Sequence, residues 1–215
     1  MDAFRDRRHA GQALVEQLRD LPLKRPVVLA LPRGGVPVGH EVARALNAPL
    51  DVLLVRKIGA PGNEEFALGA VVGGAEPQWV MDEDMMRLFD PPPGWFEHKV
   101  AEQLDEIERR RALYCGARMP MLLEGRDLLL VDDGLATGST ARVAIQALRT
   151  GGAGRIVLAV PVGPLETVQR LRPLVDELVC LETPDPFRAV GNHYRDFRQV
   201  SDQEVVELLA PGARG

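Results

Sequence analysis

The chain has 215 residues, 46% of them hydrophobic, which is enough for one large α/β domain or a domain with a substantial insertion. Its net charge of −5 argues against a protein that binds nucleic acid through general attraction to phosphates. The charged N-terminus lacks the apolar core of a signal peptide, and no apolar run approaches the ~20 residues that cross a membrane. Cys115 and Cys180 have neither metal-like nor redox-like spacing, so we expect two reduced thiols in a cytoplasmic protein.

Apolar strand patterns alternate with helix patterns along the chain. In order, the sequence predicts a helix at 4–20, a strand at 27–31, a helix with its apolar stripe at 38–46, a strand at 51–55, a polar loop at 56–66, a hairpin at 67–81, a long helix from 95 to about 115, a strand at 128–131, a helix at 141–150, a strand at 155–160, a helix near 164–172, a strand at 177–181 and a short helix at 202–210. Gly59, Pro61 and Gly62 favour the loop, and Gly73 marks the turn of the hairpin.

This alternation, with wholly apolar strands, is typical of an α/β fold with a doubly wound, mainly parallel sheet that helices cover on both faces. We expect a single domain over residues 1–215, with an inserted hairpin and helix at about 73–120. Ligands of such sheets bind in the crevice at the carboxyl ends of the strands. The turns after four of the strands, at 33–35, 56–57, 132–140 and 184–187, would therefore converge on one edge.

The stretch at 128–140 carries the strongest chemical signal. Four apolar residues lead to two adjacent carboxylates, Asp132 and Asp133, and a turn of small residues at 136–140 then enters a helix. Such a turn directs backbone N–H groups, hydroxyls and the positive end of the helix dipole at one spot, which suits a phosphate. Carboxylates beside that spot can accept hydrogen bonds from sugar hydroxyls. The stretch therefore predicts a site for a phosphorylated sugar.

The segment Val131-Asp-Asp-Gly-Leu-Ala-Thr-Gly-Ser-Thr140 resembles the motif with which type I phosphoribosyltransferases bind phosphoribosyl pyrophosphate, PRPP. Three further segments follow the order of that family: 31–35 resembles the pyrophosphate-binding loop, 56–59 the start of the flexible loop, and 183–187 with Val190 and Gly191 the base-holding hood of hypoxanthine-type members. The resemblance spans about 27–197, with the hood at about 183–197. It is strongest to a group of predicted phosphoribosyltransferases without a settled substrate, some of which are fused to a hydrolase domain.

The resemblance implies a reaction in which a nitrogenous base displaces pyrophosphate from C1′ of PRPP, with Mg²⁺ as cofactor. The implied ribose ligands are Asp132 and Asp133, directly or through water on the metal, and the implied 5′-phosphate ligands are Ala136, Thr137, Gly138, Ser139 and Thr140. The pyrophosphate would lie against Arg33, Gly34, Gly35 and Lys57, and the implied catalytic residues are Arg33, Lys57, Asp132 and Asp133.

The flexible loop and the hood complete the implied site. The loop at 58–66, with Gly59, Glu64 and Glu65, would close as a lid that excludes water. Phe187 and Asp196 of the hood would contact the base. Type I members are commonly homodimers, so we expect a second copy as a partner.

Two departures from the family pattern leave the acceptor open. Hypoxanthine-type members carry an acid where this chain has Ala136, although adenine-type members also have alanine there. Proton transfer would then fall to Glu64 or Glu65. The hood also carries one residue more between Phe187 and Val190 than hypoxanthine-type hoods do. A purine is the first candidate for the base because the hood is otherwise hypoxanthine-like.

Each motif also has a purely structural interpretation: the acidic pair can cap a helix, 33–35 can be an ordinary turn, Lys57 can extend from a sheet edge, and Phe187 can be core. Beside an active transferase, the sequence leaves open a PRPP- or nucleotide-binding regulator that has lost turnover. A hydrolase or phosphatase-like enzyme is disfavoured because the sequence has no nucleophile elbow or metal-ligand cluster. The histidines lack ligand spacing, which argues against a metal held mainly by histidine.

Overall fold

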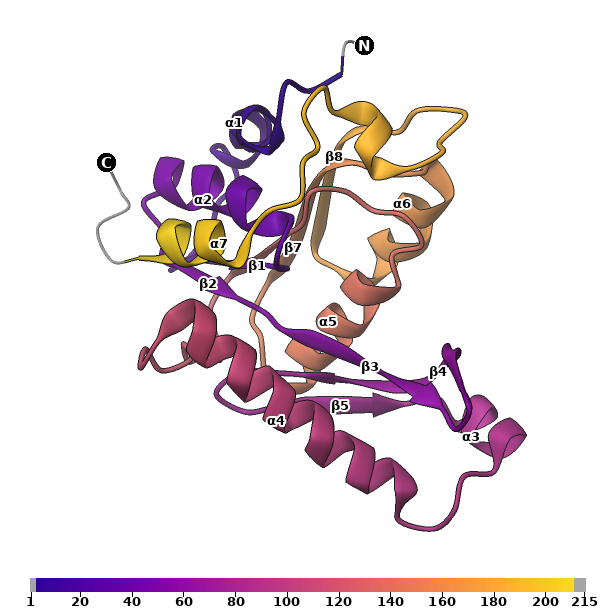
Figure 1. Cartoon of the computed structure of the whole chain (residues 1–215). Coiled ribbons are helices and arrows are strands. Elements are labelled where there is room, and N and C mark those ends of the chain that lie inside the picture. Colours follow the sequence, from indigo (N-terminus) through magenta and orange to yellow (C-terminus); the bar gives the residue numbers. More distant parts are fainter. Residues whose placement is uncertain (1–2, 211–215) are drawn as a thin grey trace.

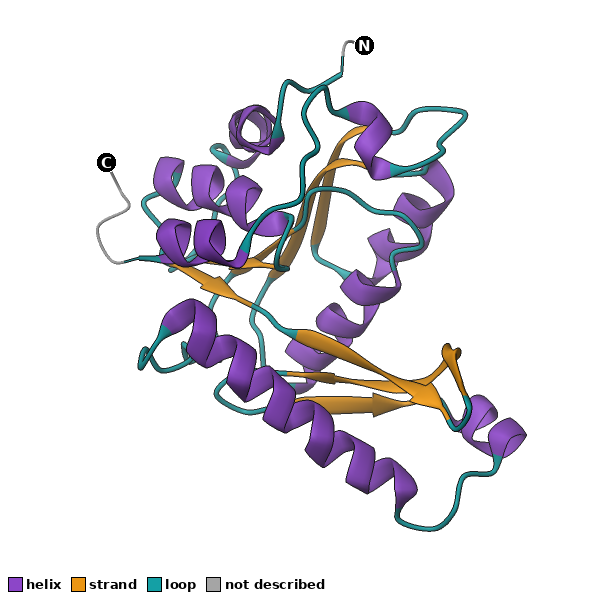
Figure 2. Ribbon diagram, viewed as in Figure 1, coloured by secondary structure: helices purple, strands orange, loops and turns teal. Residues whose placement is uncertain are grey.

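The computed structural model describes residues 3–210, which form a five-stranded sheet, a three-stranded sheet and the helices packed on them (Figures 1 and 2). In chain order the elements are α1 (Arg7–Leu18), β1 (Val27–Ala30), α2 (Gly35–Ala45), β2 (Leu50–Val52), β3 (Val55–Ala60), β4 (Asn63–Val72), β5 (Gln78–Met81), α3 (Glu83–Phe89), α4 (Trp95–Cys115), β6 (Leu128–Val131), α5 (Ser139–Thr150), β7 (Ile156–Val162), α6 (Leu165–Leu171), the 3₁₀ turn η1 (Arg172–Leu174), β8 (Glu177–Glu182), the 3₁₀ turn η2 (Val190–His193) and α7 (Asp202–Leu209). None of these helices combines the length and apolar character that a membrane span requires.

The five-stranded sheet has the order β2-β1-β6-β7-β8, and every neighbouring pair is parallel. Strands β1, β6 and β7 are wholly buried because their side chains are apolar on both faces. On one face Leu29, Leu130 and Leu158 pack with α5 and α6, and on the other Val28 and Leu129 pack with α1 and α2. Helices therefore cover both faces, and the predicted doubly wound α/β fold is confirmed.

The polar loop expected at 56–66 is instead a β-hairpin. Strand β3 pairs antiparallel with β4, and the two-residue turn at 61–62 contains Gly62 at φ +73°. Ile58, Ala60 and Leu68 are buried, so an apolar face favours the strands over the loop. Gly59 lies at a register shift, where a Cβ would come within 2.6 Å of the Glu64 Cα. The glycines and proline at 59–62 thus form a bulge and a turn within a hairpin.

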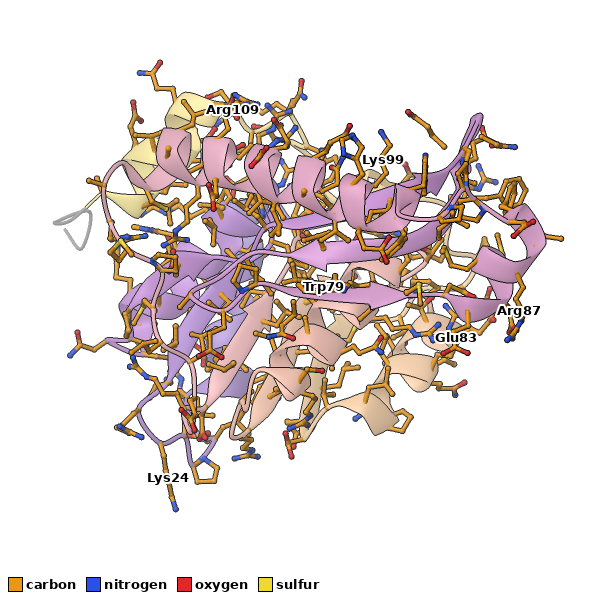
Figure 3. The ribbon with its side chains drawn as sticks, turned by 90° about the horizontal axis from the view of Figure 1, so that it is seen from below. Lys24, Trp79, Glu83, Arg87, Lys99 and Arg109 are labelled. Carbon is orange, nitrogen blue, oxygen red and sulfur yellow. The ribbon has the colours of Figure 1, made fainter. Side chains whose placement is uncertain are left out.

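A second antiparallel pair, β4 with β5, matches the hairpin expected at 67–81, with Gly73 and Gly74 in its connection. The segment that departs from the parallel sheet begins at β3, however, and not at residue 73. Helix α4 packs on this smaller sheet through Phe96, Val100 and Ile107. Figure 3 labels Lys99 and Arg109 on α4 and Trp79 on β5.

The N-terminal segment and the hood lie side by side at the top of Figure 1. Phe4 forms a parallel bridge with Tyr194: its backbone N–H donates to His193, and its carbonyl accepts from Arg195. Asp196 donates its backbone N–H to the Arg5 carbonyl. The hood is therefore joined to Phe4 and Arg5, just before α1.

Candidate active site

Asp132 and Asp133 stand where β6 ends at the carboxyl edge of the parallel sheet. The backbone N–H of Asp133 donates to Asp132 Oδ1 at 2.8 Å, and the Tyr194 hydroxyl donates to the Asp133 carbonyl at 2.6 Å. The Arg7 guanidinium pairs with the Asp133 carboxylate, Nε to Oδ2, at 2.8 Å. Both acids are partly buried. The predicted acidic pair is thus a fixed and partly desolvated feature of the strand end.

Burial and a neighbouring charge act strongly on Asp132. Burial, followed by the neighbouring charge of Asp133, raises the pKa of Asp132 well above its ordinary value, and Arg7 works in the opposite direction. Burial likewise raises the pKa of the Tyr194 hydroxyl, which therefore stays protonated and donates its hydrogen bond. Burial also raises the pKa of the Cys180 thiol to about 11, which removes it as a nucleophile near neutral pH.

The loop at 33–35 lies directly against the acidic pair. A Cβ on Gly34 would come within 2.0 Å of Asp133 Oδ2, and one on Gly35 within 2.7 Å of the Val131 carbonyl oxygen. Only glycine permits this approach of backbone to carboxylate. The structure therefore brings the predicted pyrophosphate loop and the predicted ribose acids together. The peptide bond between Pro32 and Arg33 is cis.

The Arg33 side chain is held by residues that the sequence analysis missed. Its Nη1 lies 3.6 Å from Asp202 Oδ1 at the first turn of α7, and the Tyr114 hydroxyl of α4 donates to the same oxygen at 2.8 Å. Arg33 and Asp202 lie far apart in the sequence, so no local pattern could predict this contact.

The segment at 136–140 comprises a turn and the start of α5: Gly138, at φ +73°, is the N-cap residue, and Ser139 and Thr140 are the first residues of the helix. A Cβ on Gly138 would come within 2.6 Å of the Thr167 methyl group. Thr167 donates to the Ala136 carbonyl at 3.0 Å, and Arg170 donates to the Thr137 carbonyl at 2.9 Å. Two residues of α6 thus fix the turn at the positive end of the α5 dipole. Neither was predicted from the sequence.

Lys57 reaches the phosphate turn itself. Its Nζ donates to Ser139 Oγ at 2.8 Å, and it lines a cavity of about 870 Å³ with Thr137, Arg142 and Arg170. The expectation placed Lys57 with the pyrophosphate loop. In this arrangement it instead contacts the turn assigned to the 5′-phosphate.

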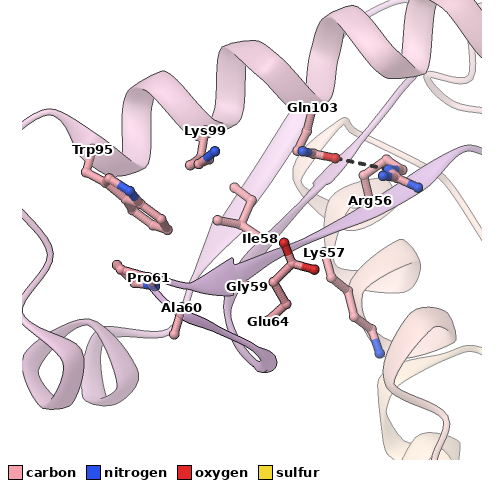
Figure 4. A pocket seen from close by; sticks show the side chains of 11 residues that line it. Arg56, Lys57, Ile58, Gly59, Ala60, Pro61, Glu64, Trp95, Lys99 and Gln103 are labelled. Atoms are coloured by element: carbon pink, nitrogen blue, oxygen red, sulfur yellow. Dashed lines mark hydrogen bonds between the residues drawn. The ribbon is translucent and has the colours of Figure 1, made fainter.

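Arg56 points to the other face of the hairpin, as alternate residues of a strand must. It donates to Gln103 of α4 at 3.0 Å and, with Arg33 and Thr140, lines a small cavity of about 70 Å³. A larger cavity of about 690 Å³ lies between the hairpin and α4 (Figure 4). Gly59 and Glu64, two of the expected lid residues, line this larger cavity with Trp95, Lys99 and Gln103. Glu65, the third, is exposed.

The hood places one predicted base contact in a cluster and the other at the surface. The Phe187 ring stacks on His193, with centroids 5.3 Å apart and planes 16° apart. Val190 fits against Gly134, where a Cβ would come within 2.6 Å of the valine methyl group. Asp196 is exposed and accepts from the backbone N–H of Arg198. The sequence analysis did not single out His193 or Gly134.

The oxygen ligands available for a divalent cation are the carboxylates of Asp132 and Asp133. Within residues 3–210, no group of three or more histidine, cysteine, aspartate or glutamate side chains comes together. Two carboxylates alone suit a hard cation that takes its remaining ligands from substrate and water, which is how Mg²⁺ is usually bound.

Comparison with known proteins places these features in a family. Residues 5–196 match the model of the phosphoribosyl transferase domain. The "Putative phosphoribosyl transferase Rv0571c" of Mycobacterium tuberculosis (strain H37Rv) is 46% identical over 209 residues, covering 97% of this chain and 47% of that protein. The crystal structure of TT1426 from Thermus thermophilus is 47% identical, with a TM-score of 0.84, and covers 97% of this chain and 98% of that one. The structure of AQ2163 from Aquifex aeolicus, at 14% identity and a TM-score of 0.50, shares the fold.

The chain therefore belongs to the phosphoribosyltransferase family, a family of pentosyltransferases, and the resemblance inferred from its motifs is confirmed. The chain spans about half the length of the curated relatives it matches.

Proposed function

We propose that this protein transfers the 5-phosphoribosyl group of PRPP to a nitrogenous base and releases pyrophosphate. The observation that carries the proposal is the convergence of the acidic pair, the glycine loop at 33–35 and the turn at 136–140 on one edge of the sheet. A diol, a pyrophosphate and a 5′-phosphate each find matching chemistry there. A simpler sugar phosphate would leave the glycine loop unused.

In the proposed reaction a ring nitrogen of the base bonds to C1′ as the bond from C1′ to the pyrophosphate oxygen breaks. Asp132 and Asp133 hold the ribose hydroxyls and favour the positive charge that develops on the sugar. The turn at 136–140 holds the 5′-phosphate, and Arg33 with the amides of Gly34 and Gly35 binds the pyrophosphate. Lys57, which now contacts Ser139, would add positive charge beside the phosphates.

The acidic pair fits Mg²⁺ as the cofactor, because carboxylate oxygens are its preferred protein ligands. Asp132 and Asp133 would hold the ion together with PRPP and water. When bound, it would supply charge neutralisation of the leaving pyrophosphate.

A purine is the proposed class of base. Phe187 stacks on His193 and is only partly buried, and an aromatic ring in the hood is suited to contact a planar base. Asp196 is the proposed polar contact to the base, although its carboxylate would have to turn away from the backbone N–H of Arg198.

Glu64 and Glu65 are the proposed proton-handling residues, and the β3–β4 hairpin that carries them is the proposed lid. A cytoplasmic homodimer is the proposed state.

The test is a base screen with Mg²⁺ and PRPP that follows pyrophosphate release. Release with one or more purines is expected, and the Asp132→Asn/Asp133→Asn double variant should lose it together with PRPP affinity. PRPP binding without release by any base would instead support the second candidate, a PRPP- or nucleotide-binding regulator without turnover. Ala136 is compatible with either candidate, because hypoxanthine-type enzymes carry an acid there and adenine-type enzymes have alanine. Unchanged PRPP affinity in the double variant would sink the assignment of the acids.

A further inference from the structure

Arg7 reaches from the first turn of α1 to the acidic pair and belongs to none of the four motifs. Its Nε lies 2.8 Å from Asp133 Oδ2, and the two side chains are only 11% and 15% exposed. The residues are 126 positions apart in the chain. A charge pair so enclosed is far less screened than a surface pair, so its geometry matters more.

Three contacts fix the Arg7 guanidinium. Beside the Asp133 pair, Nη1 donates to the Arg198 carbonyl at 2.7 Å, and the guanidinium carbon lies 3.9 Å from the centre of the Phe197 ring. Stacking on the ring sets the plane of the group, and two bonds then set its direction. A side chain held in this way is suited to orienting a neighbour and has little surface left for a ligand.

Asp133 is held from the other side as well. Its carbonyl accepts the Tyr194 hydroxyl, and the backbone of Gly34 leaves no space for a Cβ beside Oδ2. When Oδ2 and the backbone are fixed, the direction of Oδ1 follows from the planarity of the carboxylate.

We infer that Arg7 is a positioning residue for Asp133: it orients this carboxylate toward the ribose of PRPP. The inference rests on the proposed function. Phe197 is the last residue of the hood and Arg198 follows it, so Arg7 also joins the end of the hood to the ribose site.

The test compares Arg7→Met with Arg8→Met. Methionine keeps an apolar stem against Phe197 and removes the charge. Arg8 is the matched control, since it lies on the same helix, pairs with Glu41 and is 64% exposed. Titration calorimetry would measure the affinity for Mg²⁺–PRPP and, separately, for Mg²⁺–pyrophosphate. We expect Arg7→Met to weaken PRPP binding about 10-fold, which corresponds to ~1.4 kcal/mol, and to leave pyrophosphate binding within about twofold. Arg8→Met should change neither.

Two further variants keep the inference open to refutation. Arg7→Lys retains the charge without the planar group, so it should fold and weaken PRPP binding by less than Arg7→Met does. In the Asp133→Asn background, Arg7→Met should cause little further loss, because the carboxylate it orients is already absent.

The results distinguish a failure of the proposed function from a failure of the inference about Arg7. If the unmodified protein does not bind PRPP, the proposed function fails, and the inference with it. If that protein binds PRPP and the Arg7 variants bind it equally well, the inference alone is wrong. A parallel loss of PRPP and pyrophosphate affinity in Arg7→Met would also contradict it, because that pattern indicates general damage to the site.

Discussion

Gly34 shows how one missing Cβ shapes the candidate site. Its backbone, at φ −60° and ψ −33°, is one that any residue can adopt, so the reason for glycine is space alone. A Cβ would lie 2.0 Å from Asp133 Oδ2, which is far inside contact distance. We expect Gly34→Ala to move either the loop or the carboxylate. The loss should be about 1–3 kcal/mol of unfolding free energy, as for overpacked interiors, and at least ~10-fold in PRPP affinity.

Urea denaturation and PRPP titration check this prediction, with Gly151→Ala as the control. Gly151 also has a negative φ, −76°, but a Cβ there would meet its nearest neighbour at an ordinary 3.4 Å. The control should keep both stability and affinity. Wild-type PRPP affinity in Gly34→Ala would show that the close packing of loop and acid has no part in binding.

Local sequence predicted the parts of the site that are themselves local. The acidic pair and the turn at 136–140 are contiguous, and their residue types fix both the strand end and the helix start. Arg7, Tyr194 and Asp202 could not be predicted in this way, because their contacts depend on how distant segments pack. Arg7 lies 126 positions from its partner and Tyr194 lies 61 from its own. The residues that hold the site residues in position were therefore not predictable from local sequence.

At the level of elements, buried strands were predictable and the β3–β4 hairpin was not. A run of four apolar residues is buried on both faces only inside a sheet, so it predicts a strand. Arg56 and Lys57, at the start of β3, are polar and therefore favour a loop. In the structure these two side chains point to opposite faces of the strand: Lys57 contacts Ser139, and Arg56 contacts Gln103. Gly59, Pro61 and Gly62 also favour a loop, but such residues occur at the bulge and turn of a hairpin as well, so they do not distinguish the two.

Asp176 links two elements of the parallel sheet layer through one carboxylate. It accepts from the backbone N–H of Ile156 at the start of β7 and from the Arg149 guanidinium near the end of α5. Partial burial alone would raise its pKa, but these two hydrogen bonds prevail and hold the pKa below the ordinary value of 3.8. The stabilisation is therefore complete above the pKa of the unfolded chain and is lost as the pH falls through the lower folded-state pKa.

We expect Asp176→Asn to lower the unfolding free energy by about 1 kcal/mol at pH 7, a value already reduced for the partial exposure of the pair. The difference between the two proteins should shrink as the pH falls below ~4. Chemical denaturation between pH 3 and pH 7 measures it. Glu166→Gln, which removes an exposed pair with Arg170 at 3.5 Å, is the control and should show almost no difference. A constant Asp176→Asn difference across this range would refute the electrostatic explanation.

At the scale of the whole molecule, two bodies must be kept together: the parallel sheet, and the smaller sheet with α4. Their junction contains a buried charge. Asp51 of β2 is only 3% exposed and pairs with Arg111 of α4, Nη2 to Oδ2, at 3.0 Å. It also pairs with Arg118 and accepts from the backbone N–H of Met121. One carboxylate thus fastens the C-terminal part of α4 to the edge strand of the main sheet.

Removing that carboxylate should loosen the junction more than it disturbs either body. Asp51→Ala leaves the Arg111 guanidinium buried, and one of its nitrogens, Nε, has no partner even in the intact protein. The expected loss is about 3–5 kcal/mol of unfolding free energy, the usual effect of breaking a buried pair, and at ~2–4 °C per kcal/mol the melting temperature should fall by roughly 6–20 °C. Asp51→Leu combined with Arg111→Met should recover much of this, because the pair then becomes apolar. Hydrogen exchange should show the first loss of protection in α4, while β6 and β7 remain protected. Equal loss in α4 and β7 would show that the two bodies unfold as one unit and that Asp51 is not a separate fastening.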